Sequence, residues 1–141
     1  MSDKIFVDTN ILIYAHDIDS GLKHDTAVKV ITDLWERANG ILSNQVLQEF
    51  YIVVTRKIPK PISLSEARAI IKNYLKWQIE ENNSNSILRA SEIQEKYNIS
   101  FWDALTVTAA QQAGATKILT EDMNSGQTIE SILIENPFGN P

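Results

Sequence analysis

Four acidic residues stand where a fold of alternating strands and helices would gather them at one place. Asp8 directly follows the apolar run 5–7, and Asp122 comes shortly after the apolar run 118–119. In an open parallel sheet, ligands bind beyond the carboxyl ends of the strands. We therefore expect the carboxylates of Asp8 and Asp122 at the same edge of the sheet, where they would form part of a binding site.

Two further carboxylates are expected from helices. Ser100 and Asp103 have the spacing of a capping box, which predicts a helix from 100 to about 113 with Asp103 in its first turn. Glu49 lies inside a predicted helix at 44–57. On a helical wheel Glu49 falls among apolar residues, where an unpaired charge is costly, so we expect it to need a cation or a charged partner.

A cluster of these four acids predicts a divalent metal site. Two like charges about 4 Å apart cost roughly 4 kcal/mol at an effective dielectric near 20, and a bound cation removes that repulsion. The chain has no cysteine and only two histidines, His16 and His24, so the ligands are mainly oxygen atoms, which favours Mg²⁺ or Mn²⁺ over zinc. Such an ion activates water and stabilises a phosphodiester during in-line displacement.

The elements that must position these acids follow from the apolar pattern. Strands are expected at 4–7, 40–42 and 117–119, with an edge strand at 132–134, and helices at 10–16, 23–39, 44–57, 63–77, 86–97 and 100–113. Strands that alternate with helices predict an α/β fold, a three-layer α/β/α sandwich with a mainly parallel central sheet. A chain of 141 residues suits a single domain at 1–141.

Charge and composition restrict the partners. A net charge of −5 argues against an extended surface that binds phosphates. A local basic cluster, Arg56, Lys57 and Lys60, follows the helix of Glu49; Arg56 and Lys57 are candidate RNA contacts, although cations also suit a helix C-terminus. The first residues have neither the apolar run nor the basic flank of a signal peptide, and no stretch is long enough to span a membrane, so we expect a cytoplasmic protein.

The motifs VDTN, LQEFY, FWDAL and LTEDM occur in this order along nearly the whole chain. They resemble those of the PIN-domain ribonucleases, and most of all the VapC-type toxins of toxin–antitoxin pairs. The resemblance implies Mg²⁺- or Mn²⁺-dependent cleavage of RNA, homodimerisation, and inhibition by a small antitoxin whose C-terminal segment covers the active site. It also implies an acidic site lined by two polar residues, made of Asp8, Glu49, Asp103 and Asp122 with Asn10 and Thr120.

Within that site, the leading hypothesis is that Asp8 and Asp103 hold the ion, while Glu49 and Asp122 bind it directly or through water. Three structural alternatives remain open at this stage: Asp8 as a helix cap, Asp103 as half of a capping box, and Asp122 as a turn residue. Glu121 is a second candidate for the role of Asp122.

Two other functions are compatible with parts of the pattern. An aspartyl phosphotransferase of the haloacid-dehalogenase kind needs an acid two residues after the first aspartate, where this chain has Asn10, and a receiver domain needs a lysine after a late strand, whereas Lys117 precedes it. A non-catalytic PIN-like module that binds RNA or protein would tolerate Glu49→Gln. The apolar stretches 11–14 and 87–93 are candidates for a dimer face or for core packing.

Overall fold

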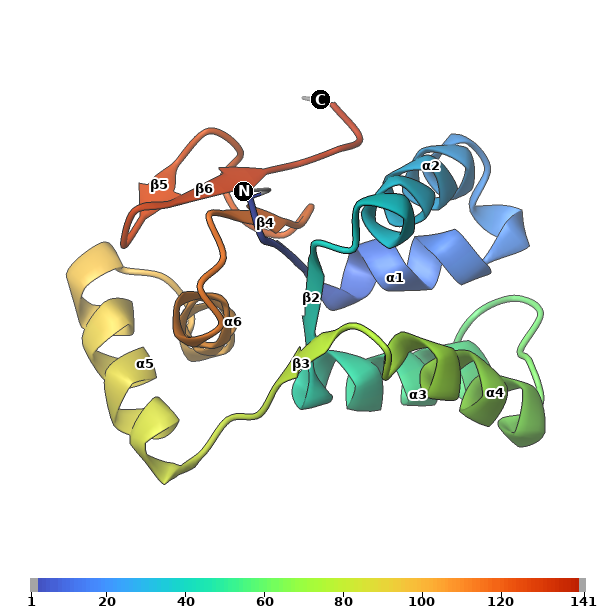
Figure 1. Cartoon of the computed structure of the whole chain (residues 1–141), viewed down its shortest axis with the longest axis horizontal. Helices are drawn as coiled ribbons and strands as arrows, with labels where there is room; N and C mark the ends of the chain where they lie inside the picture. The colour runs from blue at the N-terminus through green and yellow to red at the C-terminus, as the bar shows by residue number, and fades with distance from the viewer. Residues whose placement is uncertain (1–2, 140–141) are drawn as a thin grey trace.

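A six-stranded sheet forms the centre of the protein in the computed structural model, which describes residues 3–139 (Figure 1). Its strand order is β3-β2-β1-β4-β6-β5, and all neighbours pair in parallel except β5 and β6. The strands are β1 Ile5–Val7, β2 Gly40–Ser43, β3 Gln78–Glu80, β4 Lys117–Leu119, β5 Thr128–Ile129 and β6 Ile132–Glu135. The predicted mainly parallel sheet is confirmed.

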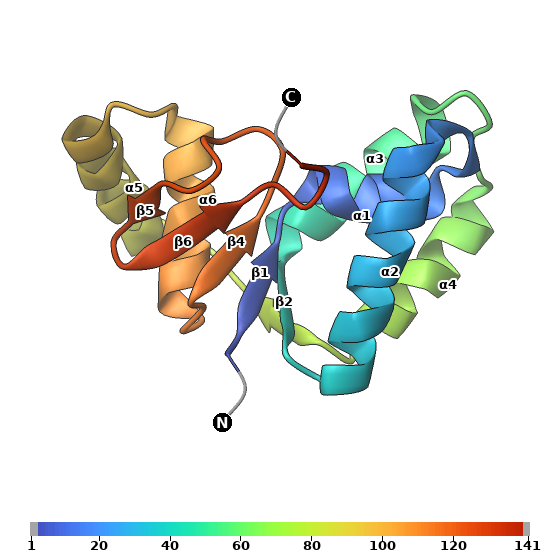
Figure 2. The ribbon, with the colours of Figure 1, turned by 90° about the horizontal axis from the view of Figure 1, so that it is seen from above.

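Helices cover both faces of the sheet, so the predicted three-layer arrangement is confirmed (Figure 2). One face carries α1 to α4 and the other carries α5 and α6. The helices are α1 Thr9–His16, α2 Leu22–Arg37, α3 Asn44–Arg56, α4 Leu64–Tyr74, α5 Ser84–Tyr97 and α6 Phe101–Gln112, with a short 3₁₀ helix η1 at Ile18–Ser20. No helix in residues 3–139 has the length and apolar character that a membrane crossing requires.

The core explains why the central strands end where they do. Phe6, Val7, Ile41, Leu42 and Ile118 are fully or almost fully buried between the two helical layers. Such continuous apolar runs are typical of parallel strands that are covered on both faces. Each run ends abruptly in a polar residue at the carboxyl edge, which is the edge where the predicted acids lie.

Helix α6 is buried along its middle, whereas Trp102 in its first turn is exposed. Its small residues Ala104, Ala109 and Ala110 and its larger Val107 have almost no exposed surface. Small side chains let the helix approach the sheet closely, and this close packing fixes the first turn, which carries Asp103, at the rim of the core.

Two short strands, the end of one helix and the edge of the sheet differ from the sequence expectations. The helix predicted at 63–77 ends at Tyr74 and is followed by β3, and neither β3 nor β5 was predicted. The expectation that 132–134 forms the edge strand was wrong, because β5 pairs with β6 on its outer side. The turn between them places Glu130 and Ser131 at positive φ, the geometry of a tight hairpin usually marked by Asn or Gly, so the sequence carried no hairpin signal.

Candidate active site

Asp8 lies between β1 and α1, half-buried at the carboxyl edge of the sheet. Its Oδ1 accepts a hydrogen bond from the Thr9 backbone N–H (2.8 Å), and its Oδ2 accepts one from the Thr120 hydroxyl (2.8 Å). Burial raises the pKa of Asp8 to about 6; the two hydrogen bonds oppose this rise, and the negative charges of Asp122 and Glu49 add to it. Asp8 therefore caps α1, which was its structural alternative, and it also lies near other carboxylates.

Thr120 links Asp8 to Asp122. The Thr120 side chain is completely buried, and its hydroxyl also accepts hydrogen bonds from the Asp122 N–H (3.1 Å) and from Asn10 Nδ2 (3.4 Å). Asn10 Nδ2 donates as well to Asp122 Oδ2 (2.9 Å). One donor and two acceptors exhaust what a hydroxyl offers, so Thr120 is fully used in joining these acids. Asn10 and Thr120 thus lie where the resemblance implies, beside the acidic residues.

Glu49 reaches the same region from α3, but its surroundings differ from the expectation. Glu49 is exposed, and its neighbour on the wheel, Ile52, is 46% exposed. Glu49 Oε2 accepts a hydrogen bond from the Thr9 hydroxyl (2.9 Å), and Oε1 accepts one from Gln45 Nε2 (3.1 Å). Glu49 lies beside Ile52 and Val53, as the helical wheel indicates, but all three residues line an open cleft, so the expectation of a buried charge was wrong.

Asp103 comes from the opposite face of the sheet, in the first turn of α6 (Figure 2). Its backbone N–H donates to the Ser100 hydroxyl (3.0 Å), which confirms Ser100 as the helix cap. Burial raises the pKa of Asp103 above its ordinary value, and the charge of Asp122 raises it further. The charge of Asp122 therefore acts on Asp8 from one helical layer and on Asp103 from the other.

Glu121 has different partners from Asp122. Its Oε1 accepts a hydrogen bond from the Tyr14 hydroxyl (2.5 Å), and its Oε2 forms an ion pair with Lys23 Nζ (2.8 Å). Tyr14 belongs to α1 and Lys23 to α2, so neighbouring acids in one loop are held by different elements. Tyr14 and Lys23 were not among the predicted site residues, because nothing in the local sequence pattern indicates contacts with a residue about a hundred positions away.

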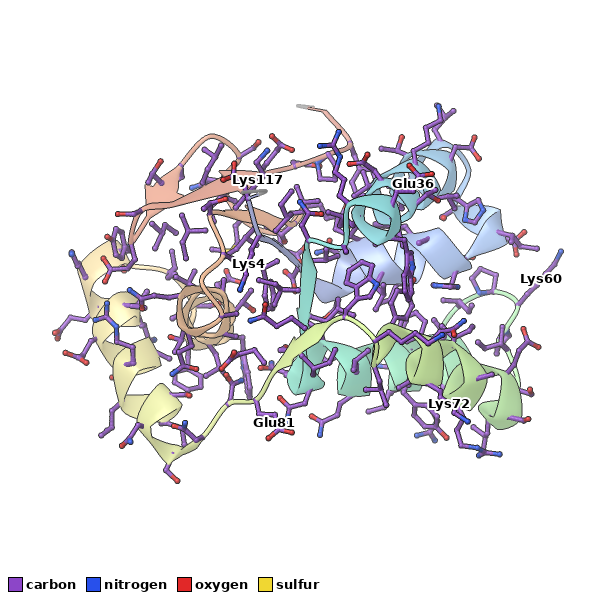
Figure 3. All side chains as sticks on the ribbon, in the orientation of Figure 1. Lys4, Glu36, Lys60, Lys72, Glu81 and Lys117 are labelled. Carbon is purple, nitrogen blue, oxygen red and sulfur yellow. The ribbon has the colours of Figure 1, made fainter. Side chains whose placement is uncertain are left out.

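The site opens into a cleft that is lined by Glu49 and Asp122 but not by Asp8 or Asp103. Its walls include the apolar side chains of Ile13 and Val53, and its lining also includes Lys57. Of the other predicted basic residues, Arg56 lies exposed in the last turn of α3, and Lys60 points outward from the loop after α3, where it pairs with Asp19 at 3.8 Å (Figure 3). The cleft thus combines acids with one of the two candidate RNA contacts.

The donor set fits a hydrated divalent ion better than a closed protein cage. In the part of the chain that the structure describes, no three acidic or histidine side chains are close enough together to enclose a cation. Mg²⁺ commonly keeps several water molecules and binds one or two carboxylates directly. Asp8, Asp122 and Asp103 interact electrostatically and fit this kind of hydrated site. Both histidines have other partners: His16 bonds to the Tyr74 hydroxyl, and His24 to the Tyr14 carbonyl.

A family model supplies the decisive comparison. The PIN domain model matches residues 5–126, which include all four predicted acids. The chain belongs to the PIN-domain family. This confirms the family resemblance stated from VDTN, LQEFY, FWDAL and LTEDM. No curated protein matches the chain.

Solved structures share this PIN-domain fold at low sequence identity. Mycobacterium tuberculosis VapC20, described as a toxin that cleaves the sarcin-ricin loop, is 22% identical, with a TM-score of 0.62 over 82% of this chain and 87% of that one. A toxin–antitoxin complex from Klebsiella pneumoniae is 17% identical, with a TM-score of 0.68 over 95% and 98%. DNA-bound VapBC from Salmonella typhimurium is 15% identical, with a TM-score of 0.65 over 96% and 99%. At these identities the likeness concerns the fold.

Proposed function

We propose that this PIN domain is a metal-dependent endoribonuclease that hydrolyses RNA phosphodiester bonds. The observation that carries the proposal is the hydrogen-bonded link from Asp8 through Thr120 and Asn10 to Asp122. The buried Thr120 hydroxyl and the half-buried Asn10 amide hold these two carboxylates at one edge of the sheet, although their charges repel each other. An arrangement that maintains such repulsion is explained by a cation that both residues serve.

The proposal gives each residue a role. Asp8 and Asp103 would hold Mg²⁺ or Mn²⁺, and Glu49 and Asp122 would bind it directly or through water. The bound ion would activate a water molecule and stabilise negative charge on the phosphodiester. Thr120 orients Asp8, and Thr9 orients Glu49, through the hydrogen bonds already described.

Substrate binding would use the cleft beside the acids. The ammonium group of Lys57 offers a local contact for a phosphate, which a chain of net charge −5 otherwise provides sparingly. Arg56, one residue earlier and exposed, would add a weaker contact at the rim. Ile13, Ile52 and Val53 supply apolar walls against which a sugar or base can pack.

We further propose that the protein is the toxin of a toxin–antitoxin pair. The solved toxin–antitoxin complexes of the same fold support this role. A mainly apolar groove between α3, α4 and β3 adjoins the acidic cleft and shares Ile52 with it. Its lining includes Leu47, Tyr51, Ile71, Leu75 and Ile79. A small antitoxin with an apolar segment ending in a basic residue would fill the groove and neutralise the acids.

A homodimer is part of the same proposal. Of the two stretches considered from the sequence, 11–14 contributes Ile11 and Leu12 to the core, whereas Ile87 and Leu88 in the second stretch are more than half exposed. Trp102, beside Asp103, is 65% exposed. These three side chains are the best candidates for a contact between two copies, which sedimentation of the wild type and of Leu88→Glu would test. Equal molecular masses for the two proteins would contradict this interface.

The nuclease is tested by incubating purified total tRNA with the protein in Mn²⁺ and in EDTA. The wild type should give discrete fragments in Mn²⁺ only, and Asp103→Asn should give none. Asp25→Asn is the matched control, because Asp25 also lies in the first turn of a helix, α2. This variant should cleave tRNA like the wild type. Undiminished cleavage by Asp103→Asn would contradict the proposal. If the wild type and both variants bind tRNA but none of them cleaves it, the result would favour the non-catalytic alternative.

A further inference from the structure

A second cluster of side chains holds the loop that carries Asp122. Glu121 accepts a hydrogen bond from the Tyr14 hydroxyl (2.5 Å) and forms an ion pair with Lys23 (2.8 Å). Lys23 Nζ also lies 5.0 Å from the centre of the Tyr14 ring and 5.6 Å from that of Phe138. The two rings meet edge to face at 5.2 Å. Three contacts therefore restrain one ammonium group, which lowers the entropy cost of its pair with Glu121.

The loop has other supports as well: the Gly126 N–H donates to the Ile134 carbonyl (2.8 Å), and Met123 packs against the core. Asn124, Ser125 and Gly126 are exposed, so they contribute little packing. The Glu121 backbone N–H donates to Asn10 Oδ1 (3.4 Å), on the side of the acidic cluster. Glu121 is thus held by its backbone towards Asn10 and by its side chain towards α1 and α2, and the next residue is Asp122.

We propose that Glu121, Tyr14 and Lys23 form a positioning clamp, which fixes Asp122 for the cation without supplying a ligand. The inference rests on the proposed nuclease function. It assigns different roles to two adjacent acids: Asp122 serves the ion, and Glu121 anchors the loop. Each Glu121 oxygen already has a strong partner, and the Lys23 ammonium group repels a cation at this carboxylate, so Glu121 is a poor ligand.

The clamp also limits the charge at the site. Lys23 compensates the carboxylate of Glu121, so the loop brings one uncompensated negative charge to the cluster and not two. Removing Lys23 would therefore both loosen the loop and add repulsion near Asp122. Tyr14→Phe removes only one hydrogen bond and leaves every charge in place, so the two substitutions separate these contributions.

The test is a calorimetric titration of the metal-free protein with Mn²⁺. Glu121→Gln and Tyr14→Phe should each weaken Mn²⁺ binding about tenfold, the scale seen when residues that orient metal ligands are replaced. In Lys23→Met the uncompensated charge of Glu121 attracts the ion, so the loss of affinity should be smaller. The double variant Tyr14→Phe with Glu121→Gln should be no weaker than Glu121→Gln alone, because the two residues act as one unit. Saturating Mn²⁺ should recover most of the cleavage of tRNA in the single variants.

The matched control is Lys96→Met. Lys96 forms an ion pair with Glu130 (3.3 Å) and lies 5.3 Å from the centre of the Tyr97 ring, so it reproduces the lysine, carboxylate and aromatic setting away from the site. This variant should bind Mn²⁺ like the wild type. Wild-type Mn²⁺ affinity in all three clamp variants would overturn the proposal. Loss of cleavage by Glu121→Gln that saturating Mn²⁺ does not recover would also overturn it, because that result indicates a ligand.

A metal-free readout separates failure of the clamp from failure of the nuclease proposal. Amide hydrogen exchange followed by NMR should be faster at Glu121 and Asp122 in Tyr14→Phe and Lys23→Met than in the wild type. If the wild type binds no Mn²⁺, the nuclease proposal fails, and faster exchange would still establish that the clamp holds the loop. Unchanged exchange in both variants would overturn the clamp whatever the metal result.

Discussion

The two ends of helix α1 each carry a half-buried titratable side chain, and burial shifts the pKa values of the two side chains in opposite directions. Asp8 caps the first turn, where burial and, to a smaller extent, the charges of other carboxylates raise its pKa to about 6. His16 ends the helix, where burial lowers its pKa to about 4 and the nearby His24 adds to the shift. A positive charge at a helix C-terminus is normally favourable, but here the cost of burial dominates.

The surroundings of the two groups explain what each one does. His16 Nε2 bonds to the Tyr74 hydroxyl (2.7 Å), and the ring packs edge-on against Phe50 and Tyr74 at 5.3 and 5.7 Å. This neutral, satisfied pair is explained by the fold alone. Asp8 has two donors but remains close to like charges, so a cation would improve its surroundings. The perturbed pKa therefore points to function for Asp8, whose neighbouring carboxylates a cation would serve, and not for His16, whose ring has a neutral hydrogen-bond partner.

The largest expected effect is on cleavage by Asp8→Asn. A metal ion contributes several kilocalories per mole of transition-state stabilisation, so loss of its ligand should reduce the rate of RNA cleavage by about a thousandfold. The amide oxygen can still accept the hydrogen bond from Thr9, and the circular dichroism spectrum should therefore be unchanged. Wild-type cleavage by a correctly folded Asp8→Asn would remove the distinction between the two ends of α1.

His16→Leu should show the reverse pattern. It leaves the buried Tyr74 hydroxyl without its partner, so the free energy of unfolding should fall by about 1–3 kcal/mol. Cleavage at temperatures where the variant is folded should match that of the wild type. Urea unfolding and the tRNA assay measure the two quantities, and a large fall in cleavage without a fall in stability would mean that His16 belongs to the site.

The pH dependence of stability sharpens the comparison, because the two groups act in opposite directions. The unfolded chain takes up a proton at histidine near its ordinary pKa of 6.5, before the folded protein does, so His16 makes the protein less stable as pH falls from 6.5 to about 4. The folded protein holds the Asp8 proton more tightly than the unfolded chain, so Asp8 makes the metal-free protein less stable as pH rises from 3.8 to about 6.

Each of these contributions amounts to about 2–3 kcal/mol across its window. Urea unfolding of the metal-free protein between pH 4.5 and 7 should give a steeper gain of stability with pH for Asp8→Asn than for the wild type. For His16→Leu the gain should shrink or reverse. Identical slopes in the three proteins would contradict both assignments.

Thr120→Val should produce the smallest effect. The substitution keeps the shape of the side chain but removes the hydroxyl that joins Asp8, Asn10 and Asp122. We expect about tenfold weaker Mn²⁺ binding, since Thr120 orients a ligand without being one. Thr106→Val is the control, because the Thr106 hydroxyl bonds only within α6, to the Trp102 carbonyl, and its loss should leave Mn²⁺ binding unchanged. Equal affinities of Thr120→Val and the wild type would contradict this role.

The sequence predicted the parts of the site that depend on where strands end. Asp8 and Asp122 follow apolar runs, and the structure places both at the carboxyl edge of the sheet, with Thr120 and Asn10 between them. Ser100 caps α6 as its spacing predicted. These features are local, so one chain is enough to read them.

The sequence failed where long-range contacts decide. A helical wheel puts Glu49 next to Ile52 and Val53 but does not show that these apolar side chains line a cleft and not the core. Strands β3 and β5 have only three and two residues, and pairing with neighbours defines them more than any local pattern does. The contacts of Tyr14 and Lys23 with Glu121 join residues far apart in the chain, and no spacing rule predicts them.

The most direct test of the account is an NMR titration of the metal-free protein with Mn²⁺, whose unpaired electrons broaden nearby signals. If the ion binds at the carboxyl edge of the sheet, amide signals of Asp8, Asn10, Asp103 and Asp122 should broaden first. Those of His16 and Tyr74, at the other end of α1, should stay sharp. The same titration of Asp8→Asn should require far more Mn²⁺. Broadening that begins elsewhere, or that is unchanged in Asp8→Asn, would contradict the assignment of the metal to this edge of the sheet.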